Sequence, residues 1–237
     1  MRDIIRLGQV ETVRKRLNEA TQSLLGDTIV LSDAEWQQPS LLPGWSRAHV
    51  ATHLARGADA LSHVVRNTAS GRMVPLYANE GQRLADIERG SERSGLELQI
   101  DLDTSAGALE EAFAEVGDWL VPVTLPIGEH PLAAVTIARL HEVCLHHLDL
   151  DTGFASHLID PVPARWLLQW SCDRLAESAH VPAVDVRSAS GVSESLGGVG
   201  ERREVTGTDA ALWGWVTGRE DGSTVDAAEG VLFPLSS

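Results

Sequence analysis

The chain of 237 residues is poor in cysteine, with Cys144 and Cys172 as its only two thiols. Two thiols without a C-x-x-C pair exclude a disulfide framework and a cysteine-rich zinc site. A metal ion would therefore have to be held by histidine and carboxylate side chains. Long hydrophobic runs are also missing, because the longest uncharged apolar stretch, residues 119–128, contains two prolines. A membrane-spanning helix needs about 20 apolar residues, so no such helix is predicted.

Basic residues are scarce: 19 Lys and Arg stand against 34 Asp and Glu, which gives a net charge of −15. They are scattered along the chain, and this argues against a nucleic-acid-binding surface. Lysine occurs once, as Lys15, in a chain rich in Arg, Ala, Gly and Val, a composition that indicates a gene of high G+C content. Residues 1–11 lack the hydrophobic centre of a secretory signal, so a cytoplasmic protein without membrane contacts is expected.

Helical periodicity dominates the chain up to about residue 180. Apolar residues in the first segment recur at spacings of three, four and seven, which places them on one face of a helix. Ser32 and Ser46 stand where the N-caps of two later helices are expected, and Pro131 suits the first turn of another. The predicted helices span residues 4–25, 32–35, 46–69, 80–89, 104–120, 131–151 and 163–179.

The character of the sequence changes after Pro182, where residues alternate between apolar and polar as in strands. The Gly- and Ser-rich residues 188–200 are interpreted as a connector between two strands. The elements predicted here are strands at residues 183–187, 202–206 and 230–233 and a helix at 208–217. Together these patterns predict a helical bundle over residues 1–155 and a small α+β domain over 156–237, with the boundary between 155 and 180.

Two pairs of possible metal ligands occur among the predicted helices, His49 with His53 and Glu142 with His146. Residues four apart lie on the same face of a helix, so each pair could bind one ion. Either pair alone is more often a set of exposed or hydrogen-bonded residues without a ligand. Two such pairs in one bundle leave a metal site and a structural role as equal alternatives.

The second pair invites confusion with the H-E-x-x-H motif of metalloproteases, which His141 and Glu142 begin. The residue four after His141 is Leu145, so the motif fails and Glu142 is a candidate ligand and not a general base. Cys144 lies two residues from Glu142 and from His146, on roughly the opposite face. It is predicted to be a small buried hydrophobic side chain.

A resemblance to a known family is carried by four segments, residues 44–56, 73–90, 139–150 and 212–219. The first and third are similar to the two metal motifs of the mycothiol-dependent maleylpyruvate isomerase family, the third having Glu and His four apart with Asp-Leu following. The second is similar to that family's connection between helices, and the fourth resembles a helix of its small C-terminal domain. The resemblance covers nearly the whole chain. It implies an N-terminal DinB-like four-helix bundle followed by a small C-terminal α+β domain.

The resemblance implies one zinc ion per chain, held by His53, Glu142 and His146 with water or substrate in the open position. Three protein ligands and an open position are what a catalytic zinc site requires. By this mapping His49 is not a ligand, and it either supports the ligands from behind or lies on the surface at a helix end. Family members often carry Asn at the position of Gly57, so this chain departs from the family one turn after His53.

The resemblance further implies mycothiol, a small thiol of actinobacteria, as cosubstrate. Zinc would favour its thiolate, which would add to the cis double bond of maleylpyruvate, permit rotation and be eliminated to leave trans fumarylpyruvate. Arg83 and Arg219, at the family's marked positions, would bind the carboxylates of this dicarboxylate substrate and contribute to binding the thiol. Tyr77 would donate a hydrogen bond at the site or simply pack.

Two other functions remain as alternatives. The chain could be an S-transferase that attaches mycothiol to another electrophile, because a fold does not fix a function. It could also be a non-catalytic metal-binding module, although a purely structural site would not need Arg83 and Arg219. The sequence determines neither the electrophile nor the oligomeric state, and a monomer is compatible with it.

Overall fold

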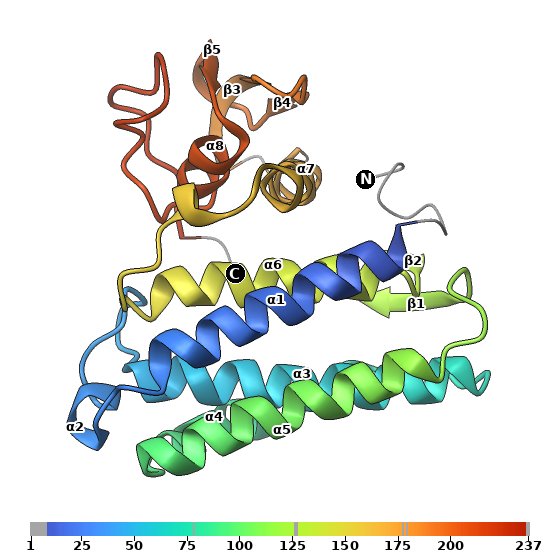
Figure 1. Cartoon of the computed structure of the whole chain (residues 1–237). Coiled ribbons are helices and arrows are strands. Elements are labelled where there is room, and N and C mark those ends of the chain that lie inside the picture. The colour runs from blue at the N-terminus through green and yellow to red at the C-terminus, as the bar shows by residue number, and fades with distance from the viewer. Residues whose placement is uncertain (1–8, 78, 126–127, 177, 179, 236–237) are drawn as a thin grey trace. The chain divides into compact units, whose positions relative to one another are not determined.

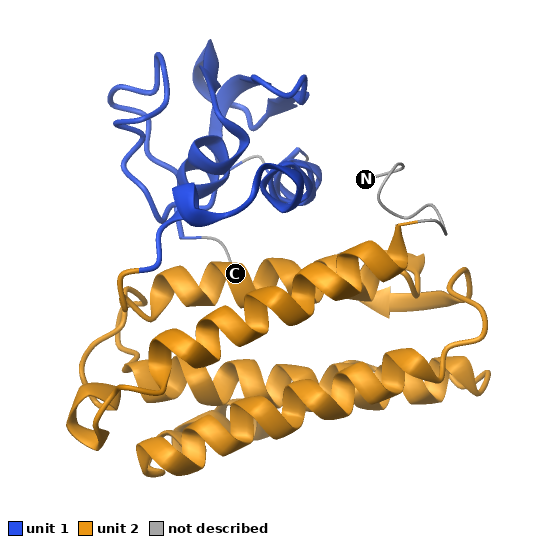
Figure 2. Cartoon of the chain, in the orientation of Figure 1, with its two compact units in different colours: residues 1–4, 154–237 blue, residues 5–153 orange. Residues whose placement is uncertain are grey.

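The computed structural model describes residues 9–77, 79–125, 128–176, 178 and 180–235. The chain divides into two compact units, one ending at residue 153 and the other formed by residues 154–237 (Figure 2). The first unit is a bundle of helices with one short hairpin, and the second combines helices with a small sheet (Figure 1). No helix among the described residues is long and apolar enough to cross a membrane.

The bundle is built from four long helices that bury one apolar stripe each. In it α1 packs against α6, and α3 packs against α5 and the shorter α4. Large side chains such as Trp36, Leu54 and Phe113 fill the interior. The helices of this unit are α1 (Val10–Thr28), α2 (Asp33–Trp36), α3 (Arg47–Ala69), α4 (Glu80–Ser91), α5 (Gly95–Ala114) and α6 (Ala134–Asp149).

Polar caps fix where several of these helices begin. The Ser46 hydroxyl accepts a hydrogen bond from the His49 N–H at 3.4 Å, and the His49 ring accepts one from the Ser46 N–H at 3.2 Å. This reciprocal arrangement starts α3 at the predicted residue. The predicted helix over 4–25 is found as α1 from Val10, and residues 4–8 lie outside the described residues.

The predicted start of the helix at residues 104–120 is wrong. Ser94 forms a capping box with Glu97, so α5 begins at Gly95, before the predicted cap at Thr104 or Ser105, and ends at Ala114. Thr104 lies inside this helix, where its hydroxyl donates to the Ile100 carbonyl at 2.7 Å and does not cap a terminus. The α6 helix also begins later than predicted, because Pro131 belongs to a hairpin of β1 (Pro122–Leu125) and β2 (Gly128–Pro131).

The second unit contains a three-stranded sheet in the part of the chain that is described. Its order is β4-β3-β5, with β3 antiparallel to β4 and parallel to β5. The predicted connector at 188–200 thus contains the strand β4. No strand forms at the predicted residues 230–233; the Phe233 ring instead packs edge-on against the Trp215 ring, with centroids 4.9 Å apart. The elements are η1 (Ser156–Leu158), α7 (Pro161–Leu175), β3 (Pro182–Ser188), β4 (Ser193–Leu196), β5 (Val199–Gly207) and α8 (Asp209–Val216).

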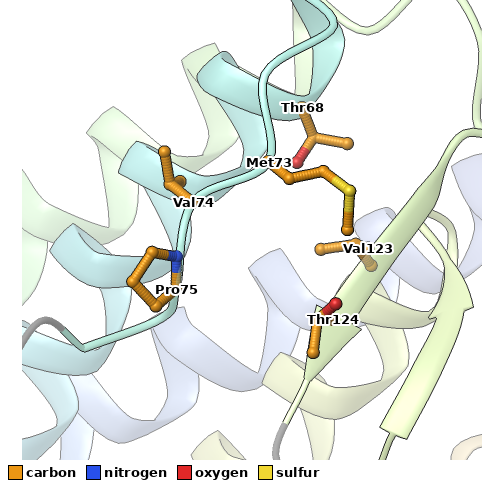
Figure 3. Close-up of a pocket in the computed structure, with 6 residues that line it drawn as sticks. All are labelled: Thr68, Met73, Val74, Pro75, Val123 and Thr124. Atoms are coloured by element: carbon orange, nitrogen blue, oxygen red, sulfur yellow. The ribbon is translucent and has the colours of Figure 1, made fainter.

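A small apolar hollow of about 240 Å³ lies beyond the end of α3 (Figure 3). At a rise of about 1.5 Å per residue, its Thr68 is about 22 Å along α3 from His53. The hollow has no acid, base or metal ligand in its lining, so it is separate from the predicted metal motifs. It is lined by Thr68, Met73, Val74, Pro75, Val123 and Thr124.

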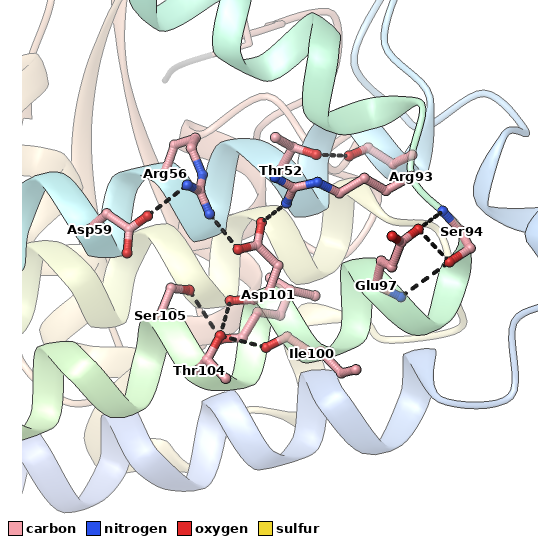
Figure 4. A network of polar contacts seen from close by, with 12 residues as sticks. Thr52, Arg56, Asp59, Arg93, Ser94, Glu97, Ile100, Asp101, Thr104 and Ser105 are labelled. Atoms are coloured by element: carbon pink, nitrogen blue, oxygen red, sulfur yellow. Dashed lines mark hydrogen bonds and ion pairs between the residues drawn. The ribbon is translucent and has the colours of Figure 1, made fainter.

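A charged network joins α3 to α5 (Figure 4). Arg56 forms ion pairs with Asp101 and, at 2.9 Å, with Asp59, and Arg93 reaches the other oxygen of Asp101 at 2.5 Å. The Asp101 side chain is only 18% exposed, so these contacts are partly shielded from water. Burial raises the pKa of Asp59, and Asp101 acts in the same direction. The network therefore connects α3 to α5 at Arg56, the residue before Gly57.

Candidate functional site

The packing of α3 and α6 brings two predicted ligands into contact. His53 and His146, 93 residues apart in the chain, face each other with their Nε2 atoms 3.1 Å apart. Their rings meet edge to face, with centroids 4.7 Å apart, and both residues are at least nine-tenths buried. Each helix presents one imidazole nitrogen to a common point, as two ligands of a single ion would.

Asp149 orients His146 from behind. Its Oδ2 atom lies 2.8 Å from Nδ1 of His146, and its side chain is completely buried. A carboxylate can only accept here, so Nδ1 carries the proton and the lone pair of Nε2 is directed at His53. The sequence pattern includes Asp149 in the Asp-Leu that follows the second motif but assigns it no role, although its position three residues after His146 on the same helix is a usable signal.

His53 is contacted by Arg83 on its other nitrogen. The Arg83 Nη2 atom lies 3.2 Å from Nδ1 of His53, and the guanidinium lies over the Tyr77 ring at 5.1 Å from its centroid. Burial lowers the pKa of His53 well below its ordinary value, and the neighbouring His146 and Arg83 act in the same direction. His53 is therefore neutral at neutral pH. Because arginine can only donate, Nδ1 of His53 accepts here and its Nε2 proton is donated to Nε2 of His146; a metal ion would bind Nε2 once this proton has moved.

Glu142, the third predicted ligand, is paired with Arg139. The Nη1 atom of Arg139 lies 3.3 Å from Oε2 of Glu142, one helical turn before His146 on α6. A Cβ atom at Gly57 would lie 3.3 Å from Nη1 of Arg139, 3.6 Å from Oε2 of Glu142 and 4.0 Å from the Tyr77 hydroxyl. The polar ends of these three side chains therefore gather beside Gly57, one turn after His53 on α3.

The described residues contain no group of three or more His, Cys, Asp or Glu side chains placed to hold a metal ion. The two imidazoles nevertheless have the spacing of a metal-binding pair, since nitrogens about 2.0–2.1 Å from a tetrahedral ion lie about 3.3 Å apart. Glu142 lies one turn before His146 on α6 and beside Gly57 of α3, and its carboxylate contacts Arg139. Two imidazoles with a carboxylate one turn away are donors whose chemistry fits zinc.

His49 lies at the start of α3, in the capping box with Ser46. Its Nε2 atom is 3.3 Å from a carboxylate oxygen of Glu88 on α4. The ring of Trp45 stacks on His49 and also lies 5.6 Å from the ring of His53. His49 thus lies at the beginning of α3 and shares Trp45 with His53, and both roles left open by the sequence stay predictions.

Neither thiol of the chain is suited to act as a nucleophile. Cys144 is buried on α6, and burial raises the pKa of its thiol to about 12. Burial raises the pKa of Cys172 as well. A thiol with such a pKa holds almost no thiolate at neutral pH.

Arg219 belongs to the second unit, after α8. Its Nη1 atom donates to the Thr217 carbonyl at 2.7 Å, and its N–H donates to the Gly214 carbonyl at 3.0 Å. The role of Arg219 stays a prediction. Of the predicted site residues, the structure brings His53, His146, Tyr77 and Arg83 together within the bundle.

Residues 17–151 match the family of mycothiol maleylpyruvate isomerase N-terminal domains, and this range holds both histidines and the residues around them. The chain belongs to this family. Two crystal structures share its fold, that of a mycothiol-dependent maleylpyruvate isomerase and that of a mutant with one histidine replaced by alanine. Each is 23% identical in sequence, covers 96% of this chain and 97% of its own, and superimposes with a TM-score of 0.86. No curated protein matches the chain.

The shared fold confirms the predicted architecture of a helical bundle followed by a small α+β region. It extends over nearly the whole chain, whereas the family match covers the bundle. The family membership also confirms the resemblance that the two metal motifs indicated.

Proposed function

We propose that this chain is a zinc- and mycothiol-dependent isomerase that converts maleylpyruvate to fumarylpyruvate. The observation that carries the proposal is the facing pair of His53 and His146, with Asp149 behind it, in a member of the mycothiol maleylpyruvate isomerase family. A buried histidine pair with a carboxylate behind one ring is an arrangement typical of metal ligands.

In this proposal His53, Glu142 and His146 hold one zinc ion per chain. When bound, zinc supplies a positive charge that favours the thiolate of mycothiol over its thiol at neutral pH. The chain needs such an external thiol because its own two cysteines are buried and their pKa values are raised. Asp149 keeps the proton of His146 on Nδ1, so that Nε2 is free to bind.

The cations beside the pair would bind the anionic substrate. An overall charge of −15 repels a dicarboxylate, so local guanidinium groups have to offset it. Arg83 is well placed because its side chain is 18% exposed and already touches His53. Burial raises the pKa of Tyr77, which keeps its hydroxyl protonated and able to donate a hydrogen bond. We propose that the chain comprises a bundle of residues 1–155 and a C-terminal domain of residues 156–237, and that Arg219 in the latter supplies a second cation to the substrate.

The test is a spectrophotometric assay of maleylpyruvate loss with and without mycothiol, on zinc-loaded protein freed of other thiols. We expect turnover only when mycothiol is present, and its loss in His53→Ala together with the bound zinc. His49→Ala is the matched control on the same helix and should retain zinc. Full turnover without any thiol would refute the proposal.

Two further results of the assay would point elsewhere. Consumption of mycothiol on another electrophile, with maleylpyruvate untouched, would establish an S-transferase. Stoichiometric zinc with no thiol-dependent reaction on either substrate would establish a metal-binding module without catalysis.

A further inference from the structure

Arg139 is a buried cation to which the proposed reaction assigns no role. Its side chain is only 4% exposed, inside the bundle on α6. Burying a guanidinium is costly unless a carboxylate compensates the charge. Its carboxylate partner is Glu142, at 3.3 Å, and this is the residue proposed to bind zinc. One carboxylate is therefore placed to serve two cations.

The absence of a side chain at position 57 leaves space beside this pairing. A Cβ atom there would come within 3.3 Å of Nη1 of Arg139, a distance shorter than ordinary van der Waals contact. Gly57 lies in the interior of α3 and its dihedral angles are helical, so the backbone does not require glycine at this position. The glycine instead leaves room for the Arg139 guanidinium between α3 and the carboxylate of Glu142.

We infer that Arg139 is a positioning residue that holds the carboxylate of Glu142 and competes with a metal ion for it. The inference rests on the proposed zinc site. Arg139 contacts Oε2 of Glu142, so a metal ion bound by Glu142 would share this carboxylate with a buried guanidinium. The positive charge of Arg139 opposes a second cation at the same carboxylate, so it lowers the affinity of the site.

This inference predicts a gain of metal affinity when Arg139 is removed. A hydrogen bond to a charged group corresponds to about a ten- to hundredfold change in an equilibrium constant. Arg139→Met should therefore bind Zn²⁺ about ten- to a hundredfold more tightly, measured by competition with a chromophoric chelator. A gain is informative because general damage to the bundle could only weaken binding. Arg139→Gln should act in the same direction, so the result does not depend on one replacement.

Three comparisons complete the experiment. Arg14→Met removes another largely buried arginine that is paired with a glutamate, Glu110, and it should leave Zn²⁺ affinity unchanged. In a Glu142→Gln background, Arg139→Met should add less than a twofold change, because the carboxylate that Arg139 holds is gone. Thermal unfolding of the metal-free proteins, followed by circular dichroism, checks that each variant is folded.

The possible outcomes separate this inference from the proposed function. Unchanged or weaker Zn²⁺ binding in both Arg139 variants would overturn the inference, and so would an equal gain in the Glu142→Gln background. If Glu142→Gln alone binds Zn²⁺ as tightly as the unaltered protein, the proposed ligand set is wrong and the inference fails with it. Loss of Zn²⁺ in Glu142→Gln with no gain in Arg139→Met would leave the ligand set intact and refute only the role of Arg139.

Discussion

Asp149 offers a direct test of how the bundle prepares His146 for a metal ion. Its carboxylate is fully buried and accepts the Nδ1 proton of His146 at 2.8 Å. Replacing Asp149 by Asn keeps the size of the side chain and removes the negative charge. The amide no longer enforces one tautomer, because its oxygen can accept a proton and its nitrogen can donate one to the ring.

The expected loss follows from what the contact does. Hydrogen-bond partners behind metal-bound histidines typically contribute about 10–100-fold to metal affinity, which corresponds to about 1.4–2.7 kcal/mol. Because Asp149 is completely excluded from water, we expect Asp149→Asn to lie toward the upper end of this range. The chelator competition that measures Zn²⁺ affinity provides the value directly.

A second histidine and carboxylate pair on the same helix provides the control. The Nε2 atom of His147 lies 3.0 Å from Oδ2 of Asp27 on α1, and the His147 side chain is 2% exposed. Asp27→Asn removes a comparable contact without touching His146, so it should change stability and leave Zn²⁺ affinity unchanged. If Asp149→Asn lowers the melting temperature of the metal-free protein but leaves Zn²⁺ affinity unchanged, or if both variants lose affinity equally, our account of His146 is refuted.

Three further predictions concern other parts of the chain. Gly90→Ala places a Cβ atom 2.3 Å from Cγ2 of Thr52 and should lower the free energy of unfolding in urea by about 1–2 kcal/mol. Gly107→Ala, on an open face of α5, should raise the free energy of unfolding by about 0.5–1 kcal/mol. Equal effects of the two substitutions would contradict the close contact between Gly90 and Thr52. Burial lowers the pKa of His147 to about 4, so the unfolded chain takes up its proton first as the pH falls. The stability contributed by neutral His147 is complete above about pH 6.5 and is lost toward pH 4. In His147→Gln, the free energy of unfolding should fall by about 3 kcal/mol less over this pH range, as measured by urea unfolding at each pH. Arg219→Ala should lower kcat/KM about ten- to a hundredfold with zinc content unchanged, and Arg219→Lys should recover part of it; wild-type kinetics in both would exclude a substrate contact.

The sequence by itself determined the local structure of most of the bundle. Apolar spacing identified α1 and α3, and Ser46 identified the start of α3, because helix formation depends on neighbours three and four residues apart. The same spacing showed that His53 and His146 lie on helices that can present them. Where two signals competed, the local pattern misled: it predicts a cap at Thr104 or Ser105, whereas Ser94 with Glu97 forms the complete capping box.

The tertiary structure alone decided which of these faces meet. His53 and His146 are 93 residues apart, and no periodicity states which helix will pack against which. Packing also buried Asp149, the partner of His146, and Arg139, the partner of Glu142, and burial turns an ordinary helical charge into one that must be compensated within the protein. The space at Gly57 has meaning only once α3 and α6 are in contact. The residues that surround the candidate site thus follow from long-range packing, whereas the helices that carry them follow from local sequence.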